Sequence, residues 1–159
     1  MNLIAIARHG IGITGPPPLA VAVARGIVLA LIRHAEPSAL VVQAAAGEAE
    51  LGWLRRLARR MRAVSLPPGV AFAARVSNGD AVVGTVLVAE READLGHRLG
   101  CVVRIGPSTI VLDRRDGSLP VEVAPEFLDL EGAMRVGAVS PPADASRYPE
   151  LGRLGANAS

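Results

Sequence analysis

The sequence predicts an α+β fold, in which an N-terminal strand and helices pack on a C-terminal antiparallel β module. The longest apolar run, Leu19–Ile32, and an arginine-rich amphipathic segment both precede residue 66. From Gly69 onward, short apolar runs alternate with turn residues, a pattern that indicates a small barrel or a curled sheet. We therefore expect a helix-rich part over residues 1–66, the β module over 67–140 and a mobile C-terminal tail over 141–159.

The first elements are predicted to be a strand, a helix and a second strand. Leu3–Ala7 predicts a short strand, and a glycine-rich connection follows over Gly10–Gly15. Pro16–Pro18 provide a rigid helix start, because proline suits a first turn, and the helix should run to about His34. Ala39–Val42 predicts a second buried strand, although a short apolar run is also compatible with a helix.

A second helix is predicted from about Glu48 to Ala63, and it is strongly amphipathic. At about 100° per residue, five arginines fall on one half of its circumference and the apolar side chains fall on the other. The arginines are Arg55, Arg56, Arg59, Arg60 and Arg62. The apolar half carries Leu51, Trp53, Leu54, Leu57, Ala58 and Met61. Two glutamates in the first turn complement the helix dipole, and Pro67-Pro68 close the segment.

The second half of the chain is predicted to consist mainly of strands. Val70–Val76 and Ala81–Val88 flank an Asn78-Gly79 pair, and such a pair between two apolar runs predicts a β-hairpin. Further strands are expected at Cys101–Ile105, Thr109–Leu112, Val121–Val123 and Met134–Val139.

Composition excludes several kinds of chemistry. The chain has 17 arginines, no lysine and a net charge of +2. Without lysine, Schiff-base catalysis, a lysine general base and a P-loop of the usual kind are excluded. The single Cys101 allows neither an intrachain disulfide nor a cysteine-based zinc site. The three histidines are too widely spaced to suggest a local metal site, so we expect no metal and no cofactor.

The chain shows no pattern typical of secretion or of a membrane span. Its start lacks the basic region of a signal peptide. Leu19–Ile32 has 14 residues, is interrupted by Arg25, and falls short of the roughly 20 residues that cross a bilayer. We expect a buried helix at this position and a cytoplasmic protein.

Two N-terminal motifs are associated with known chemistry. Gly10–Gly15 matches a dinucleotide-binding pattern, but prolines follow where a helix should offer N–H groups to a pyrophosphate, so we expect no nucleotide site. Ala7-Arg8-His9-Gly10 and Ile32-Arg33-His34-Ala35-Glu36 resemble the Arg-His-Gly signature of the histidine phosphatase family, in which a strand ends at the signature. The resemblance implies that His9 would take a phosphoryl group and that Arg8 would bind it.

The arginine segment gives the leading functional hypothesis, a non-catalytic binding or assembly protein. Arg55, Arg56, Arg59, Arg60 and Arg62, with Trp53, would dock an acidic protein surface or a phosphate backbone, because guanidinium groups bind carboxylates and phosphates in pairs. A solvated helix face and a membrane-surface helix with Trp53 at headgroup level are alternatives. High hydropathy without a span favours a homo-oligomer or a larger complex. The alternative from another class is a phosphoryl-transfer enzyme that uses Arg8 and His9.

Overall fold

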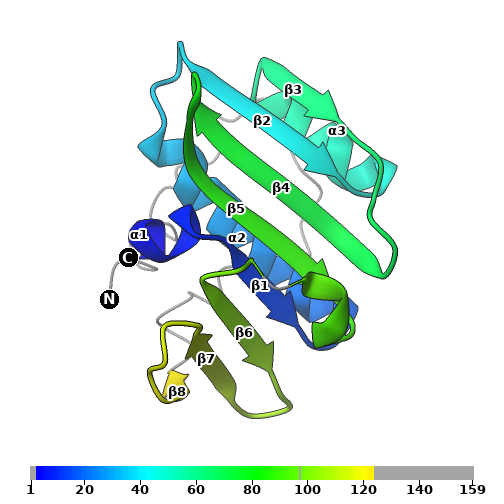
Figure 1. Cartoon of the computed structure of the whole chain (residues 1–159). Helices are drawn as coiled ribbons and strands as arrows, with labels where there is room; N and C mark the ends of the chain where they lie inside the picture. The colour runs from blue at the N-terminus through cyan, green and yellow to red at the C-terminus, as the bar shows by residue number, and fades with distance from the viewer. Residues whose placement is uncertain (1–2, 97, 124–159) are drawn as a thin grey trace.

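The protein is described by a computed structural model, which covers residues 3–96 and 98–123 (Figure 1). Within these residues, the strands are β1 (Ile11–Thr14), β2 (Leu40–Ala45), β3 (Arg60–Ala63), β4 (Val70–Asn78), β5 (Ala81–Ala89), β6 (Cys101–Ile105), β7 (Ile110–Arg114) and β8 (Val121–Val123). The helices are α1 (Leu3–Arg8), α2 (Pro17–His34), α3 (Glu48–Leu57) and the 3-10 helix η1 (Glu92–Leu95). The fold is α+β, as the sequence predicts.

The strands form one mixed sheet of eight strands in the order β3-β2-β4-β5-β1-β6-β7-β8. β1 lies in the middle and pairs in parallel with both β5 and β6. β2 pairs in parallel with β3, and the remaining neighbours are antiparallel. The sheet stays open, so the expected small barrel does not form, and strands from both halves of the sequence share it.

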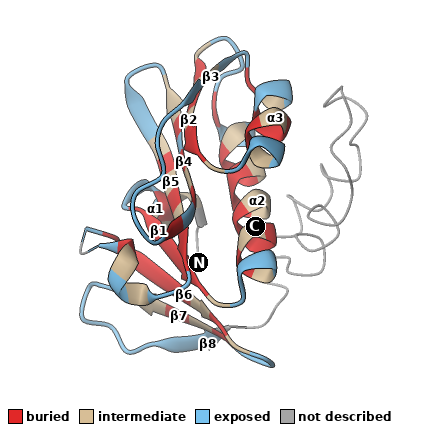
Figure 2. Ribbon diagram, turned by 90° about the vertical axis from the view of Figure 1, so that its right-hand side faces the viewer, coloured by how far each residue is buried: buried red, intermediate tan, exposed pale blue. Residues whose placement is uncertain are grey.

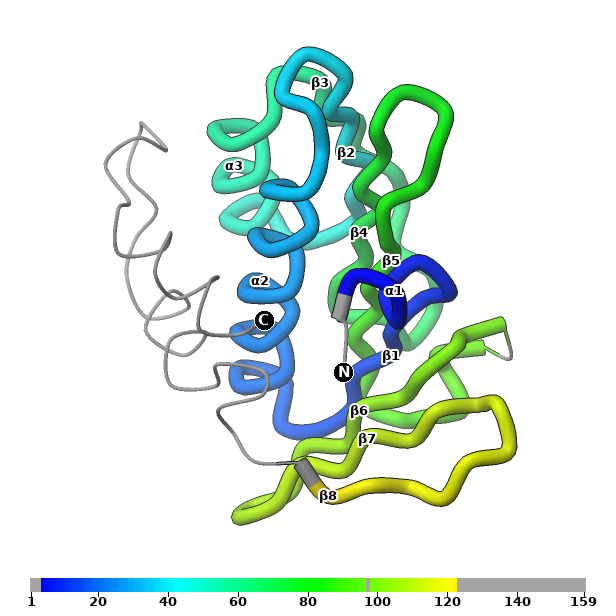
Figure 3. The backbone as a smooth tube through the Cα atoms, turned by 90° about the vertical axis from the view of Figure 1, so that its left-hand side faces the viewer, coloured from blue at the N-terminus to red at the C-terminus, as the bar shows by residue number. Residues whose placement is uncertain are grey.

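Two helices cover one face of this sheet (Figures 2 and 3). α2 places Val23, Ile27 and Leu31 against the strands, and all three are fully or almost fully buried. Phe72 of β4, also fully buried, meets them from the sheet. α2 is long and apolar enough to cross a membrane by length and composition, and 44% of it is buried inside the structure. The expected buried helix is therefore present.

The secondary structure predicted for the first two segments, residues 3–7 and 10–15, is wrong. Leu3–Arg8 is a helix and not a strand, because a short apolar run carries too little periodicity to separate the two. The glycine-rich connection is the central strand β1. Gly12 belongs there for a packing reason, since a Cβ at this position would lie 2.5 Å from a methyl group of Leu99 and 2.8 Å from one of Leu95.

The predicted arginine helix is too long. α3 ends at Leu57, where Ala58 takes an extended conformation (φ −130°, ψ 121°), and residues 60–63 pair with β2 as the edge strand β3. Alternation along β3 turns Met61 toward the core and leaves Arg60 and Arg62 exposed. Ala58 and Met61 fit an apolar helix stripe and an alternating strand equally well, and pairing with β2 decides between them.

The remaining predictions of elements hold where the structure describes them. α2 and β2 are present, and β4 and β5 form the expected hairpin around Gly79, whose φ of 65° suits a tight turn. β6 and β7 form the second hairpin, and β8 pairs with β7. The strand expected at Met134–Val139 and the tail expected over 141–159 lie outside the described residues.

Candidate functional site

The five arginines of the predicted helix are divided between two layers. Arg55 and Arg56 are exposed on α3, and Arg55 lies 3.7 Å from Glu48 in a solvent-exposed ion pair. Arg59 is exposed in the connection after α3, and Arg60 and Arg62 are exposed on β3. The predicted continuous stripe is therefore wrong, because two of its members belong to the helical layer and two to the sheet.

Trp53 does not accompany the arginines at the surface. Its side chain is buried, with 3% of the residue exposed, and the guanidinium of Arg25 lies 5.8 Å from its ring centroid. Arg25 in turn donates a hydrogen bond from Nε to Glu50 at 2.7 Å. Trp53 therefore anchors α3 to α2, and the prediction that it contacts a partner or lipid headgroups is corrected.

The strand register brings a different arginine beside Arg62. Arg62 pairs with Gln43 on β2, Gln43 pairs with Arg75 on β4, and Arg75 pairs with Thr85 on β5. Partners in register point to the same face of a sheet, so these four side chains form one row across four strands. At about 4.8 Å per strand, Arg62 and Arg75 are anchored about 10 Å apart.

This row lies on the face that α2 and α3 leave uncovered. Phe72, Ala74 and Val76 of β4 are buried on the helical side, and the alternating Arg75 is exposed on the other. We call the side chains of Arg60, Arg62 and Arg75 the arginine face. Figure 1 looks onto this side of the sheet, with β3, β2, β4 and β5 lying side by side and the helices behind them.

The arginine face has no compensating negative charge on its own strands. β2, β3, β4 and β5 contain no aspartate or glutamate. None of the three arginines has an ion-pair partner among residues 3–96 and 98–123. Sequence reasoning missed Arg75, although it is the one charged residue of an alternating strand and sits at an exposed position of the alternation.

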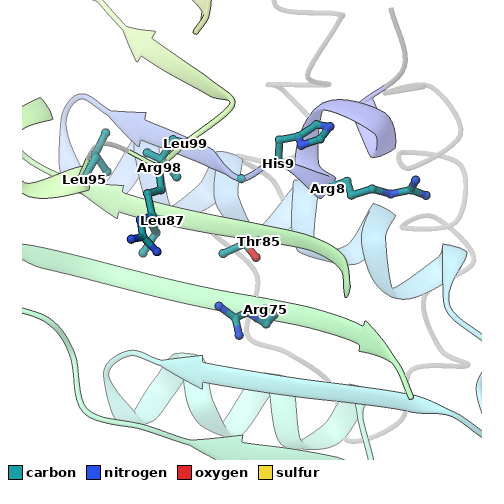
Figure 4. Close-up of a pocket in the computed structure, with 10 residues that line it drawn as sticks. Arg8, His9, Arg75, Thr85, Leu87, Leu95, Arg98 and Leu99 are labelled. Carbon is teal, nitrogen blue, oxygen red and sulfur yellow. The ribbon is translucent and has the colours of Figure 1, made fainter. Parts of the chain in front are cut away.

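A cavity of about 490 Å³ opens beside Arg75 on the same side of the sheet (Figure 4). Its wall is built by β4 and β5, by the turn between α1 and β1, and by the connection from η1 to β6. The lining residues are Arg8, His9, Gly10, Arg75, Thr85, Leu87, Leu95, Gly96, Arg98 and Leu99. Figure 4 shows Arg98 reaching toward Leu87 with Arg75 on the neighbouring strand, whereas Arg8 extends away from both.

A second cavity, of about 630 Å³, lies on the other side of His9. It shares His9, Arg98 and Leu99 with the first cavity and adds Arg114 and Arg115. Its one carboxylate is Asp116, which accepts a hydrogen bond from the backbone N–H of Ser118 at 2.9 Å. The turn around His9 is thus surrounded by cationic side chains on both sides.

An ion-pair network holds the wall that η1 contributes. Arg104 of β6 donates to Glu92 at 2.7 Å and to Asp113 at 2.9 Å, and Arg115 donates to Glu92 at 2.7 Å. The hydrogen bond from Arg104, above all, lowers the pKa of Glu92 from its ordinary value. The same contacts raise the pKa of Arg104, so Glu92 and Arg104 both remain charged at neutral pH. η1 is therefore tied to the β6–β7 hairpin.

The surroundings of Arg8 and His9 differ from those that the phosphatase resemblance implies. In that family a strand ends at the Arg-His-Gly signature, but here helix α1 ends at Arg8 and strand β1 starts at Ile11. The second string, with His34, closes helix α2. Arg8 and His9 do line the first cavity, while His97 lies outside the described residues.

Cys101 is a core residue and takes no part in this surface. It is fully buried in β6, and burial raises the pKa of its thiol to about 11. The thiol is therefore neutral and protected at physiological pH.

No family model, curated protein or solved structure matches the chain. A function is therefore proposed below from the arginine face and from the cavity beside it.

Proposed function

We propose that this protein is a non-catalytic binding protein that docks an acidic protein partner on its arginine face. The observation that carries the proposal is the placement of Arg60, Arg62 and Arg75 on one uncovered sheet face without a carboxylate on the same strands. The docking element is the sheet, and the helix α3 stands in the opposite layer.

Charge complementarity favours this function. Paired arginines elsewhere in the chain, such as Arg25 and Arg104, already hold carboxylates, whereas those of the arginine face have their donors directed to solvent. A guanidinium can bind a carboxylate through two parallel hydrogen bonds, and such pairs are stronger than neutral hydrogen bonds. An acidic partner would supply the missing acceptors.

The side chains between the arginines favour a protein over a nucleic acid. Val41 of β2 is partly exposed and pairs in register with Arg60, and Ala73 of β4 is partly exposed two residues before Arg75, so both lie on the same face as the arginines. Arginine is enriched in protein interfaces relative to the rest of the surface. Single-stranded nucleic acid is bound mainly by stacking on aromatic rings, and the described aromatic residues, Trp53 and Phe72, are buried.

The test compares two double variants with the same change in net charge. Arg60→Gln with Arg62→Gln neutralises the edge of the arginine face, and Arg33→Gln with Arg55→Gln neutralises exposed arginines on the helices. Fluorescently labelled poly-L-glutamate is the acidic probe, titrated at several salt concentrations. We expect the first variant to bind at least about 10-fold more weakly than the natural chain, because two charge-assisted contacts are lost, and the second to change by less than about 2-fold.

Four results would overturn the proposal. Equal losses in both variants would show that net charge alone attracts the probe, and a loss confined to the Arg33/Arg55 variant would place docking on the helices. Tighter binding of a dT20 oligonucleotide, dependent on Arg60 and Arg62, would identify a phosphate backbone as the partner. Absence of binding to either probe at low salt would remove the docking function.

A further inference from the structure

We propose that the 490 Å³ cavity beside Arg75 is a second binding site, for a small organic oxyanion that carries a phosphate or carboxylate group on an apolar body. The site shares Arg75 with the arginine face but does not include the docking edge at β3, since neither Arg60 nor Arg62 lines it. Its ligand is a small molecule and not a protein surface.

The charge of the lining points to an anion. Arg75 and Arg98 both line the cavity, and neither has an ion-pair partner in the described part of the chain. No carboxylate of residues 3–96 and 98–123 lines it. The hydroxyl group of Thr85 lies between β4 and the η1–β6 connection and adds a hydrogen-bond donor. An oxyanion would therefore find two guanidinium groups and a hydroxyl group in the lining of one cavity, with no competing negative charge among the described lining residues.

The remaining wall is apolar. Leu87, Leu95 and Leu99 line the cavity, and Leu95 and Leu99 belong to a small buried cluster with Val102. Leu95 and Leu99 are otherwise buried and Leu87 is partly exposed, so the apolar surface open to the cavity is largest at Leu87. An anion with an apolar body would cover this surface, whereas a free inorganic anion would leave it in water. The volume lies within the roughly 300–1,000 Å³ that small-molecule sites occupy, so a ligand with a ring or a short alkyl chain fits.

The site is held in shape before a ligand arrives. Leu95 is the last residue of η1, and Glu92, the first residue of η1, is hydrogen-bonded to Arg104 and Arg115. Leu95 and Leu99 also fill the space over Gly12 in which a Cβ would collide with them. Because the apolar wall is anchored to β6 and β1, binding does not have to order it, and less free energy is lost on association.

The test uses 8-anilinonaphthalene-1-sulfonate, a fluorescent anion on an apolar ring system, with the full chain. We expect saturable binding of one probe per chain, and displacement by phenyl phosphate, benzoate and octanoate at lower concentration than by phenol or octanol. Arg98→Gln should weaken probe binding about 10-fold, a loss typical of one charge-assisted contact. Arg33→Gln is the matched control, since it removes an exposed arginine that does not line the cavity, and it should leave binding unchanged.

Phenyl phosphate and benzoate carry the same ring and therefore distinguish the two sources of oxyanion. Stronger displacement by phenyl phosphate identifies a phosphate ligand, and stronger displacement by benzoate identifies a carboxylate. Equal displacement by the neutral alcohols would show an apolar patch without anion selectivity and would overturn the proposal. So would probe binding that is unaffected by both Arg98→Gln and Arg75→Gln. The Arg60/Arg62 variant should bind the probe as the natural chain does, so this site and the docking function can fail independently.

Discussion

The arginines of this chain differ in whether a carboxylate compensates them. Arg25, Arg91, Arg104 and Arg115 each donate a side-chain hydrogen bond to an aspartate or a glutamate. The arginines of the arginine face and Arg98 have no such partner in residues 3–96 and 98–123. Composition alone shows only an excess of arginine, whereas the structure separates the arginines that hold carboxylates within the fold from those on which the two proposed binding sites depend.

The contribution of the arginine–carboxylate pairs to stability can be tested at Glu92, which accepts hydrogen bonds from Arg104 and Arg115. Because its pKa is lowered in the folded protein, it contributes stability above the ordinary glutamate pKa of about 4.3, and this contribution is lost as the pH falls through the lowered pKa. We expect Glu92→Gln to cost about 1 kcal/mol or less near pH 7, since 38% of the side chain is exposed and solvent screens the pairs. Urea unfolding from pH 7 to pH 3 measures the effect.

The difference between Glu92→Gln and the natural chain should shrink toward pH 3. Glu36→Gln, at an exposed glutamate with no ion-pair partner among the described residues, is the control and should show no such convergence. If Glu92→Gln lowered the free energy of unfolding by the same amount at every pH, side-chain packing and not charge would hold η1 to the β6–β7 hairpin.

Single elements could be predicted where local signals were strong. The prolines before α2 and the Asn78-Gly79 turn locate an element start and a hairpin without reference to the rest of the chain. Leu3–Arg8 and residues 58–63 carry no such signal, because their apolar spacing suits both a helix and a strand. Tertiary contacts decide those segments, since α1 packs against β5 and residues 60–63 pair with β2.

Gly52 and Gly79 both have open surroundings, so substitutions at these positions measure the effect of local backbone conformation on stability. A Cβ at Gly52 in α3 or at Gly79 in the β4–β5 turn would meet nothing within 4 Å, so space does not distinguish them. Gly79 has a φ of 65°, which disfavours any other residue. We expect Gly79→Ala to destabilise the protein by about 1 kcal/mol and Gly52→Ala to stabilise it by about 0.5–1 kcal/mol.

Chemical unfolding of the two variants side by side measures these changes in the free energy of unfolding. Each glycine variant is the control for the other, because both add the same methyl group at an uncrowded position. If both changed the free energy of unfolding in the same direction, backbone conformation would not be the cause.

The whole molecule is connected through its central strand. β1 comes from the first 15 residues, yet it lies between β5 and β6, which the second half of the sequence provides. One hydrophobic cluster includes Trp53 of α3 together with Cys101 of β6 and Leu112 of β7. Residues from both halves therefore share a core.

This arrangement predicts a single cooperative unfolding transition. Trp53 fluorescence reports on α3, and alkylation of the buried Cys101 thiol reports on β6. We expect both signals to change at the same urea concentration. Leu112→Ala, a truncation in β7, should lower the free energy of unfolding by about 2–5 kcal/mol and shift the Trp53 transition with it. Alkylation of Cys101 at urea concentrations that leave Trp53 fluorescence unchanged would instead show that the β6–β8 region unfolds separately.

The sequence by itself determined the α+β class, the long helix α2, the β4–β5 hairpin, and the exclusion of lysine chemistry and of an intrachain disulfide, because each depends on composition or on a signal a few residues long. Only the tertiary structure decided that Leu3–Arg8 is a helix, that β1 is the central strand, and that Arg60 and Arg62 belong to the sheet. It also brought Arg75 near Arg62 and placed Arg75 and Arg98 in the lining of one cavity. The physical reason is that strand pairing and side-chain burial join residues far apart in the chain, and no local pattern records which segments will meet.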